Sequence, residues 1–231
     1  STGALLVEDD DSLRKIFNVI RRRASFHAED EYRLNDRKNL RIEGDPRSHP
    51  VWRDETAALL ATQRLVNLAR ETGRRIHVLH ITTRQEIDYL RDHKDVASCE
   101  ATPHHLTMAA PECYERLGTL AQMNPPVRDA AHRAGIWRGI EQGIVDVLGS
   151  DHAPHTLEEK QKIYPASPSG MTGVQTLVPL MLDHVNAGRL SLARFVDLSS
   201  AGPARLFNIA CKGRIAAGYD ACQGVGTLLC D

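Results

Sequence analysis

The sequence lacks any apolar run close to the ~18 residues that a membrane span needs, and its beginning lacks the layout of a signal peptide. It also lacks net charge, since 29 Lys and Arg residues face 30 Asp and Glu residues. This balance leaves no field that would attract nucleic acid or an anionic lipid surface. We therefore expect a cytoplasmic protein that binds neither nucleic acid nor a membrane.

Paired cysteines are missing as well. The five cysteines are odd in number and no two stand in a C-x-x-C spacing, which argues against a disulfide framework and against a thiolate zinc site. Histidine is plentiful, with 11 residues, and several follow apolar runs. This pattern favours imidazole over sulfur as a metal ligand.

Strand and helix patterns alternate along the chain, without repeats or a domain linker. The patterns predict strands over 24–30, 75–81, 96–101 and 144–148, and a polar loop over 34–50. They predict helices over 11–20, 50–70, 84–93, 129–142, 172–185, 191–198 and 203–207. Strands separated by helices in this way form a parallel sheet, whose ligands gather at the carboxyl ends of the strands.

Polar side chains follow the predicted strands. The densest cluster, over 149–160, comes directly after the strand 144–148 and includes Asp151 and His155. Because parallel strands end at the same edge of a sheet, we expect one rim to collect His27, His80, Glu100, Asn124 and Asp151.

Two imidazoles and a carboxylate of this rim, those of His27, His80 and Asp151, form a set that suits Zn²⁺. A zinc ion with an open position lowers the pKa of its bound water to about 7, and Asp151 could then act as general base and acid. A histidine at a strand end can equally be a structural residue held by hydrogen bonds, so both interpretations stay open. His155 follows a proline and is expected to contact substrate, whereas His49 is expected to be a surface or packing residue.

Several motifs together resemble those of dihydroorotases in the amidohydrolase superfamily. They are Asp151-His152-Ala153-Pro154-His155 with the following 156–160, Glu100-Ala101-Thr102-Pro103-His104-His105, Met123-Asn124-Pro125-Pro126, His27-Ala28-Glu29-Asp30 and His77-Val78-Leu79-His80. The related hydantoinases and allantoinases usually lack the second histidine of the first motif. The resemblance covers about residues 1–221.

The resemblance implies an α/β fold, the TIM-type (β/α)₈ metal-dependent hydrolase barrel, that interconverts dihydroorotate and N-carbamoyl-aspartate in pyrimidine biosynthesis. It implies that His27, His80 and Asp151 bind one or two Zn²⁺ ions, that Asp151 carries the proton, and that Asn124 and His155 hold the substrate. It further implies a homo-oligomer, and aspartate transcarbamoylase as a possible protein partner.

The sequence also departs from the family pattern. It has no strand with a His-x-His pair, no arginine or asparagine after such a pair, and no metal-bridging lysine. A complete barrel takes about 250 residues, so we expect 1–213 to form roughly its C-terminal half, with two unpaired sheet edges. We expect 214–231 to begin a C-terminal segment whose tail, 222–231, is atypical and indicates a truncated, frame-shifted or partly recorded chain.

Three hypotheses follow for the function. The first is a dihydroorotase whose 231 residues alone have weak or no activity, because part of the site is missing. The second is a cyclic amidase of the hydantoinase or allantoinase type. The third is a non-catalytic dihydroorotase-like scaffold for aspartate transcarbamoylase, which the absence of an upstream His-x-His pair would favour.

Overall fold

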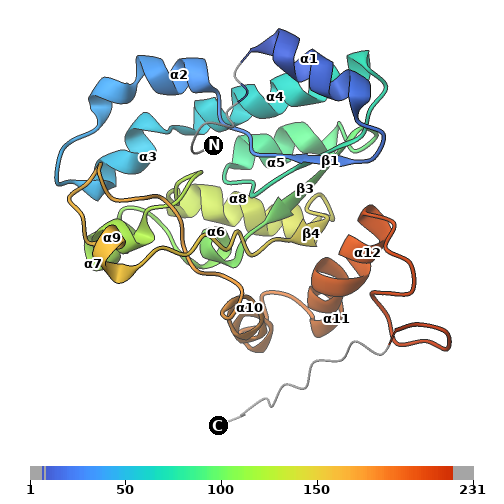
Figure 1. Ribbon diagram of the computed structural model, residues 1–231. Helices are drawn as coiled ribbons and strands as arrows, with labels where there is room; N and C mark the ends of the chain where they lie inside the picture. The colour runs from blue at the N-terminus through green and yellow to red at the C-terminus, as the bar shows by residue number, and fades with distance from the viewer. Residues whose placement is uncertain (1–6, 8, 221–231) are drawn as a thin grey trace.

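A four-stranded parallel sheet forms the centre of the molecule (Figure 1). The computed structural model describes residues 7 and 9–220. The strands follow one another in the sheet in chain order, as β1 (Ala24–Phe26), β2 (Ile76–Val78), β3 (Ala97–Ala101) and β4 (Val147–Leu148). All four predicted strands are confirmed, although each is shorter than its apolar run. This order is that of successive strands in a (β/α)₈ barrel, which confirms the predicted fold class.

Helices precede β1, fill each connection and follow β4. Before β4 they are α1 (Asp10–Val19), α2 (Glu31–Asp36), α3 (His49–Trp52), α4 (Glu55–Glu71), α5 (Arg84–Arg91), α6 (Pro103–Thr107), α7 (Glu112–Leu117) and α8 (Ala130–Glu141). After β4 they are α9 (Leu157–Lys160), α10 (Leu177–Asn186), α11 (Leu192–Val196) and α12 (Gly202–Leu206). Single turns over 38–40, 46–48 and 118–121 and a π-helical turn over 197–201 complete the described structure.

The main core lies between one face of the sheet and the helices α4, α5 and α8 (Figure 1). Alternate residues of β3 show the two faces. Ala97, Cys99 and Ala101 are buried in this core, whereas Ser98 and Glu100 contact His77 of β2 on the other face. The face away from the helices is therefore polar, and it leads to the carboxyl ends of the strands.

Two glycines allow α8 to lie directly against α5. A Cβ atom at Gly135 would lie 2.4 Å from Cβ of Arg84, and one at Gly139 would lie 2.6 Å from Cδ1 of Ile87. Both distances are below any real contact, so no larger residue fits without a shift. The glycines thus set the separation of the two helices that cover β3.

The predicted helix over 50–70 is wrong at its beginning. Arg53 leaves the helical conformation, with φ −92° and ψ 66°, and the carboxylate of Asp54 accepts a hydrogen bond from the backbone N–H of Ala57. Asp54 therefore caps a new helix, α4, and the chain divides into α3 and α4. The predicted loop over 34–50 likewise contains the end of α2 and two short turns.

Other predictions concern the whole chain. No helix in the described part of the chain is both long and apolar enough to cross a membrane. Cys99, Cys113 and Cys211 are free thiols. The atypical tail, 222–231, with Cys222 and Cys230, lies outside the described residues.

Candidate active site at the carboxyl ends of the strands

Two histidines meet where β1 and β2 end. Phe26 and Val78 are partners in the parallel pairing, so His27 and His80 leave the sheet side by side. Nδ1 of His27 lies 3.0 Å from Nε2 of His80, and the rings meet edge to face. The sequence prediction that these two residues come together is therefore correct.

The other ring nitrogen of His27 is held by a buried carboxylate. Nε2 of His27 lies 3.0 Å from Oε2 of Glu29, whose side chain is fully buried. Burial acts to raise the pKa of Glu29, but the guanidinium of Arg53 and the His27 ring hold this pKa well below its usual value. An ionised carboxylate on Nε2 leaves Nδ1 of His27 as the electron-pair donor, which is the arrangement of many metal-binding histidines.

His80 is buried and electrically neutral. Burial lowers its pKa well below the ordinary value, and the neighbouring His27 lowers it further. Its Nδ1 is buried and has no hydrogen-bond partner among the described residues. A neutral imidazole is the form that binds metal ions, and His80 is held in that form.

The carboxylate of Glu100 contacts the side chain of His77 and the backbone of His80. Its Oε2 accepts a hydrogen bond of 3.1 Å from Nε2 of His77, and its Oε1 lies 3.4 Å from the backbone N of His80. A Cβ atom at Gly149 would lie only 2.3 Å from Oε1 of Glu100. Gly149, two residues before Asp151, is thus required because the Glu100 carboxylate occupies the space of a side chain.

Asp151 follows β4 on the same rim. Burial raises its pKa, and the negative charge of Glu100 adds to the effect, while His27 and His104 oppose it. Within the described residues the Asp151 carboxylate has no hydrogen bond or ion pair. Its backbone has a left-handed φ of 44°, and that of His80 has a φ of 37°. Both conformations are uncommon for residues other than glycine and are typical of functional positions.

The donor set fits a zinc ion in part. Two nitrogens that bind one tetrahedral zinc at about 2.0–2.1 Å are about 3.3 Å apart. This is close to the 3.0 Å between Nδ1 of His27 and Nε2 of His80. A neutral imidazole has one free electron pair, so Nδ1 of His80 then carries the hydrogen, and the carboxylate of Asp151 is the third candidate donor. No three His, Cys, Asp or Glu side chains of the described residues stand together in a geometry that could hold a metal ion. Ligation by His27, His80 and Asp151 therefore stays a prediction.

The two predicted substrate residues, Asn124 and His155, have their printed contacts outside this group. Oδ1 of Asn124 and the carbonyl oxygen of Met123 each lie 3.0 Å from Nε2 of His49. Because both partners are oxygens, this nitrogen carries the hydrogen, and the amide NH₂ of Asn124 points elsewhere. His155 is exposed, with Nε2 3.3 Å from the carbonyl oxygen of Ser169. The substrate role of both residues stays a prediction.

His49 is the residue whose importance the sequence prediction missed. It is buried, 2% exposed, and it connects α3 to Asn124. Burial and the charge of Arg53 lower its pKa to about 3, so it stays neutral. No local pattern identifies it, since its partners lie 74, 75 and 115 residues away.

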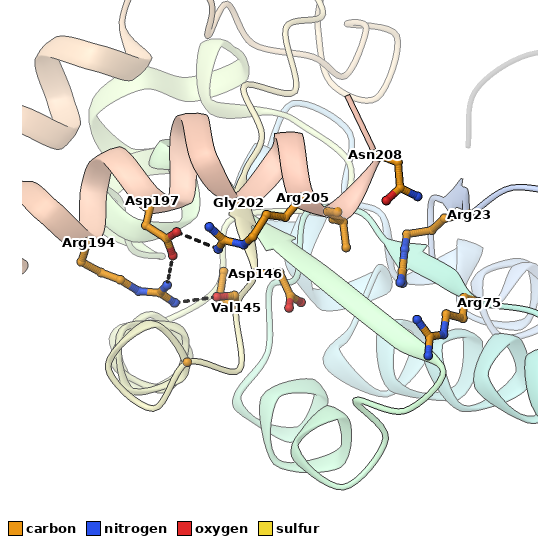
Figure 2. Close-up of a pocket in the computed structure, with 11 residues that line it drawn as sticks. Arg23, Arg75, Val145, Asp146, Arg194, Asp197, Gly202, Arg205 and Asn208 are labelled. Carbon is orange, nitrogen blue, oxygen red and sulfur yellow. Dashed lines mark hydrogen bonds and ion pairs between the residues drawn. The ribbon is translucent and has the colours of Figure 1, made fainter. Parts of the chain in front are cut away.

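A cavity of about 400 Å³ lies at the opposite ends of the strands (Figure 2). Arg23 and Arg75 line it just before β1 and β2, and Arg194 and Arg205 both bind the carboxylate of Asp197, at 2.8 and 2.7 Å. Nη1 of Arg23 donates to the backbone carbonyl of β2 at 2.8 Å. This cavity is separate from the candidate site, because it opens at the amino ends of the strands.

Comparison with known proteins identifies the family. The sequence profile of the amidohydrolase family matches residues 43–223. The chain belongs to the amidohydrolase family. Curated relatives within this amidohydrolase group include a protein named dihydroorotase from Halobacterium salinarum, 38% identical over 195 residues, and another from Methanosphaera stadtmanae, 36% identical over 219 residues. These alignments cover 84% and 90% of this chain but 45% and 50% of the two relatives.

Solved amidohydrolase structures agree with the fold. The L-hydantoinase (dihydropyrimidinase) from Arthrobacter aurescens superposes with a TM-score of 0.86 at 31% identity, over 92% of this chain and 50% of that protein. A protein titled D-hydantoinase superposes with a TM-score of 0.84 at 26% identity, over 96% and 52%. The chain thus spans about half the length of its relatives, and its structure is part of the amidohydrolase barrel.

Proposed function

We propose that this chain is part of a zinc-dependent dihydroorotase, a cytoplasmic enzyme that reversibly interconverts dihydroorotate and N-carbamoyl-aspartate in pyrimidine biosynthesis. The observation that carries the proposal is the His27–His80 pair at 3.0 Å, with Glu29 fixing the far side of His27. The motifs on the rim and the relatives named dihydroorotase support the choice of substrate.

In this proposal His27, His80 and Asp151 hold one or two zinc ions. A zinc ion held by these residues would lower the pKa of its bound water to about 7 and so would supply hydroxide at neutral pH. Asp151 takes the proton of the attacking water as a C–O bond forms at the ring carbonyl, and returns it to the ring nitrogen as the C–N bond breaks.

Asn124 and His155 orient the substrate. The hydrogen bond from His49 fixes the Asn124 side chain by its oxygen, which leaves the NH₂ group to donate to a substrate oxygen. In this proposal His155, on the loop after Asp151, binds a carboxylate of the substrate.

Zinc titration of the purified chain tests the metal site directly. We expect His27→Ala and His80→Ala each to weaken zinc binding by at least tenfold, as measured by calorimetry, and His93→Ala to leave it unchanged. In the protein that shows turnover, Asp151→Asn should lower kcat by a factor of about 10²–10⁴. Zinc binding that is indifferent to His27 and His80, or full turnover by Asp151→Asn, would contradict the proposal.

The 231 residues alone should hydrolyse dihydroorotate weakly or not at all. Their sequence has no His-x-His strand, and they span about half of their relatives. A purified chain with turnover that depends on Asp151 would contradict this prediction. We further propose a homo-oligomer as the working state, and aspartate transcarbamoylase as a partner if the protein acts as a scaffold.

A hydantoinase-type amidase is the second candidate. It is favoured by the L-hydantoinase structure, which is 31% identical to this chain. Comparing dihydroorotate, hydantoin and allantoin as substrates of the same preparation separates the two candidates. Preference for hydantoin or allantoin would replace the dihydroorotase proposal while retaining the amidase chemistry.

A further inference from the structure

The lysine that ends the 149–160 cluster has no role in the proposed chemistry, yet it is buried. Lys160 is 5% exposed, and its ammonium group donates to three backbone carbonyls. Nζ lies 2.9 Å from the oxygen of Gln122, 3.0 Å from that of Pro168 and 3.0 Å from that of Gly170. A lysine ammonium has three hydrogens, so all three are used. No carboxylate contacts Lys160 within the described residues.

The three carbonyls belong to segments that carry the candidate substrate residues. Gln122 stands two residues before Asn124, and Gly170 stands one residue after Ser169, whose carbonyl contacts His155. The segments also bind one another, because Gly170 donates its N–H to the oxygen of Gln122 at 2.9 Å. Lys160 is therefore the point at which the segments 118–124, 153–160 and 165–171 meet.

A buried ammonium without a counter-charge is unfavourable as a simple filler of space. Burial lowers the pKa of Lys160 to about 8, which reflects the free energy lost when the charge leaves water. A methionine has nearly the same length and would fill the space without this penalty. The only contacts that offset this cost are the hydrogen bonds from the ammonium group to three carbonyl oxygens. These hydrogen bonds fix the relative positions of the three segments.

We propose that Lys160 is a positioning residue that sets the placement of Asn124 relative to His155 and thereby determines how well the substrate is held. The inference rests on the proposed function for the substrate it names. The geometric part, that the ammonium fixes the two side chains, does not depend on the identity of the substrate.

The test compares Lys160→Met and Lys160→Arg with Lys162→Met, whose site is exposed and two residues away. Nuclear magnetic resonance of the chain follows the Asn124 side-chain amide and the His155 ring, and urea unfolding follows stability. We expect both signals to shift or split in Lys160→Met and in Lys160→Arg, since a planar guanidinium cannot direct three N–H groups to the same three carbonyls. Lys162→Met should leave both signals unchanged.

Binding of N-carbamoyl-aspartate, measured by calorimetry, gives the second readout. We expect both Lys160 variants to weaken it by at least tenfold, and KM to rise more than kcat falls wherever turnover is measurable. Altered stability with both resonances unmoved would overturn the inference and leave Lys160 a packing residue. If Lys160→Met fails to fold, Lys160→Arg decides: wild-type resonances and affinity in that variant overturn the inference. Absence of binding by the unmodified chain would count against the proposed substrate, while the resonances would still decide the role of Lys160.

Discussion

At the scale of single residues, the site depends on groups kept in one protonation state. His80 is neutral because it is buried beside His27, and Glu29 is ionised because Arg53 and His27 outweigh the effect of burial. The rim thus presents nitrogen electron pairs and one carboxyl of raised pKa, that of Asp151. Each state follows from the burial and the neighbours of that side chain.

His49 makes stability depend on pH. Its pKa is about 3 in the folded protein and about 6.5 when unfolded, so between these values the unfolded chain binds one more proton. Stability from this group is therefore complete above pH 6.5 and is lost as the pH falls towards 3, by up to about 1.4 kcal/mol per pH unit. Urea unfolding of His49→Gln should show a shallower acid slope than the wild type. The same exchange at His93, which is partly exposed, is the control, and equal slopes in all three proteins would contradict the prediction.

The residues that the sequence revealed are those whose signal is local. His27, His80 and Asp151 each follow an apolar run, so the parallel sheet alone predicts a common edge. His49 and Lys160 could not be identified in this way. Their importance comes from carbonyls and side chains far away in sequence, and a buried histidine or lysine looks the same as an exposed one in the chain.

At the scale of elements, the sequence predicted which helices and strands exist better than it predicted where they begin and end. The four strands were predicted correctly. The helix predicted over 50–70 breaks at Arg53, which has a non-helical backbone and binds the carboxylate of Glu29, 24 residues away. Helical periodicity continues across the break, so no pattern of apolar residues shows it. The one local signal for the break was Asp54, a residue type that often caps a helix. Its carboxylate accepts a hydrogen bond from the backbone N–H of Ala57, three residues later.

The contact of α5 with α8 gives a test at this scale. Gly135→Ala should destabilise the protein by about 1–3 kcal/mol, because the new methyl group would meet the backbone and Cβ of Arg84. The gain in helix propensity, about 1 kcal/mol, acts in the opposite direction and is smaller than the clash. Ala134→Ser on the exposed side of α8 is the control, and the measurement is the midpoint of urea unfolding. A stabilised Gly135→Ala variant would show that the helices separate freely.

At the scale of the whole molecule, the described residues form two apolar cores of unequal size. The larger lies between the sheet and its helices. The smaller lies under the rim and consists of Cys113, Tyr114, Ala121, Met123 and Val127, with four partly buried neighbours. The second core supports Asn124 without belonging to the sheet, so the candidate site rests on both.

The smaller core should open before the larger one. Few apolar residues hold it, so its free energy of opening should lie well below that of global unfolding. Native-state hydrogen exchange should show amides of 113–123 exchanging through a local opening, while amides of β2 and β3 exchange only on global unfolding. Equal opening free energies for both sets would show one cooperative unit instead.

The left-handed backbone at His80 and Asp151 has a consequence for divergence. Glycine adopts φ values of 37° and 44° freely, so either residue could change to glycine and relieve its backbone while losing its functional side chain. At these two positions selection for folding alone would therefore not preserve the side chains that the proposed function needs. A duplicated gene could in this way give rise to a folded relative that lacks the side chains of the proposed site.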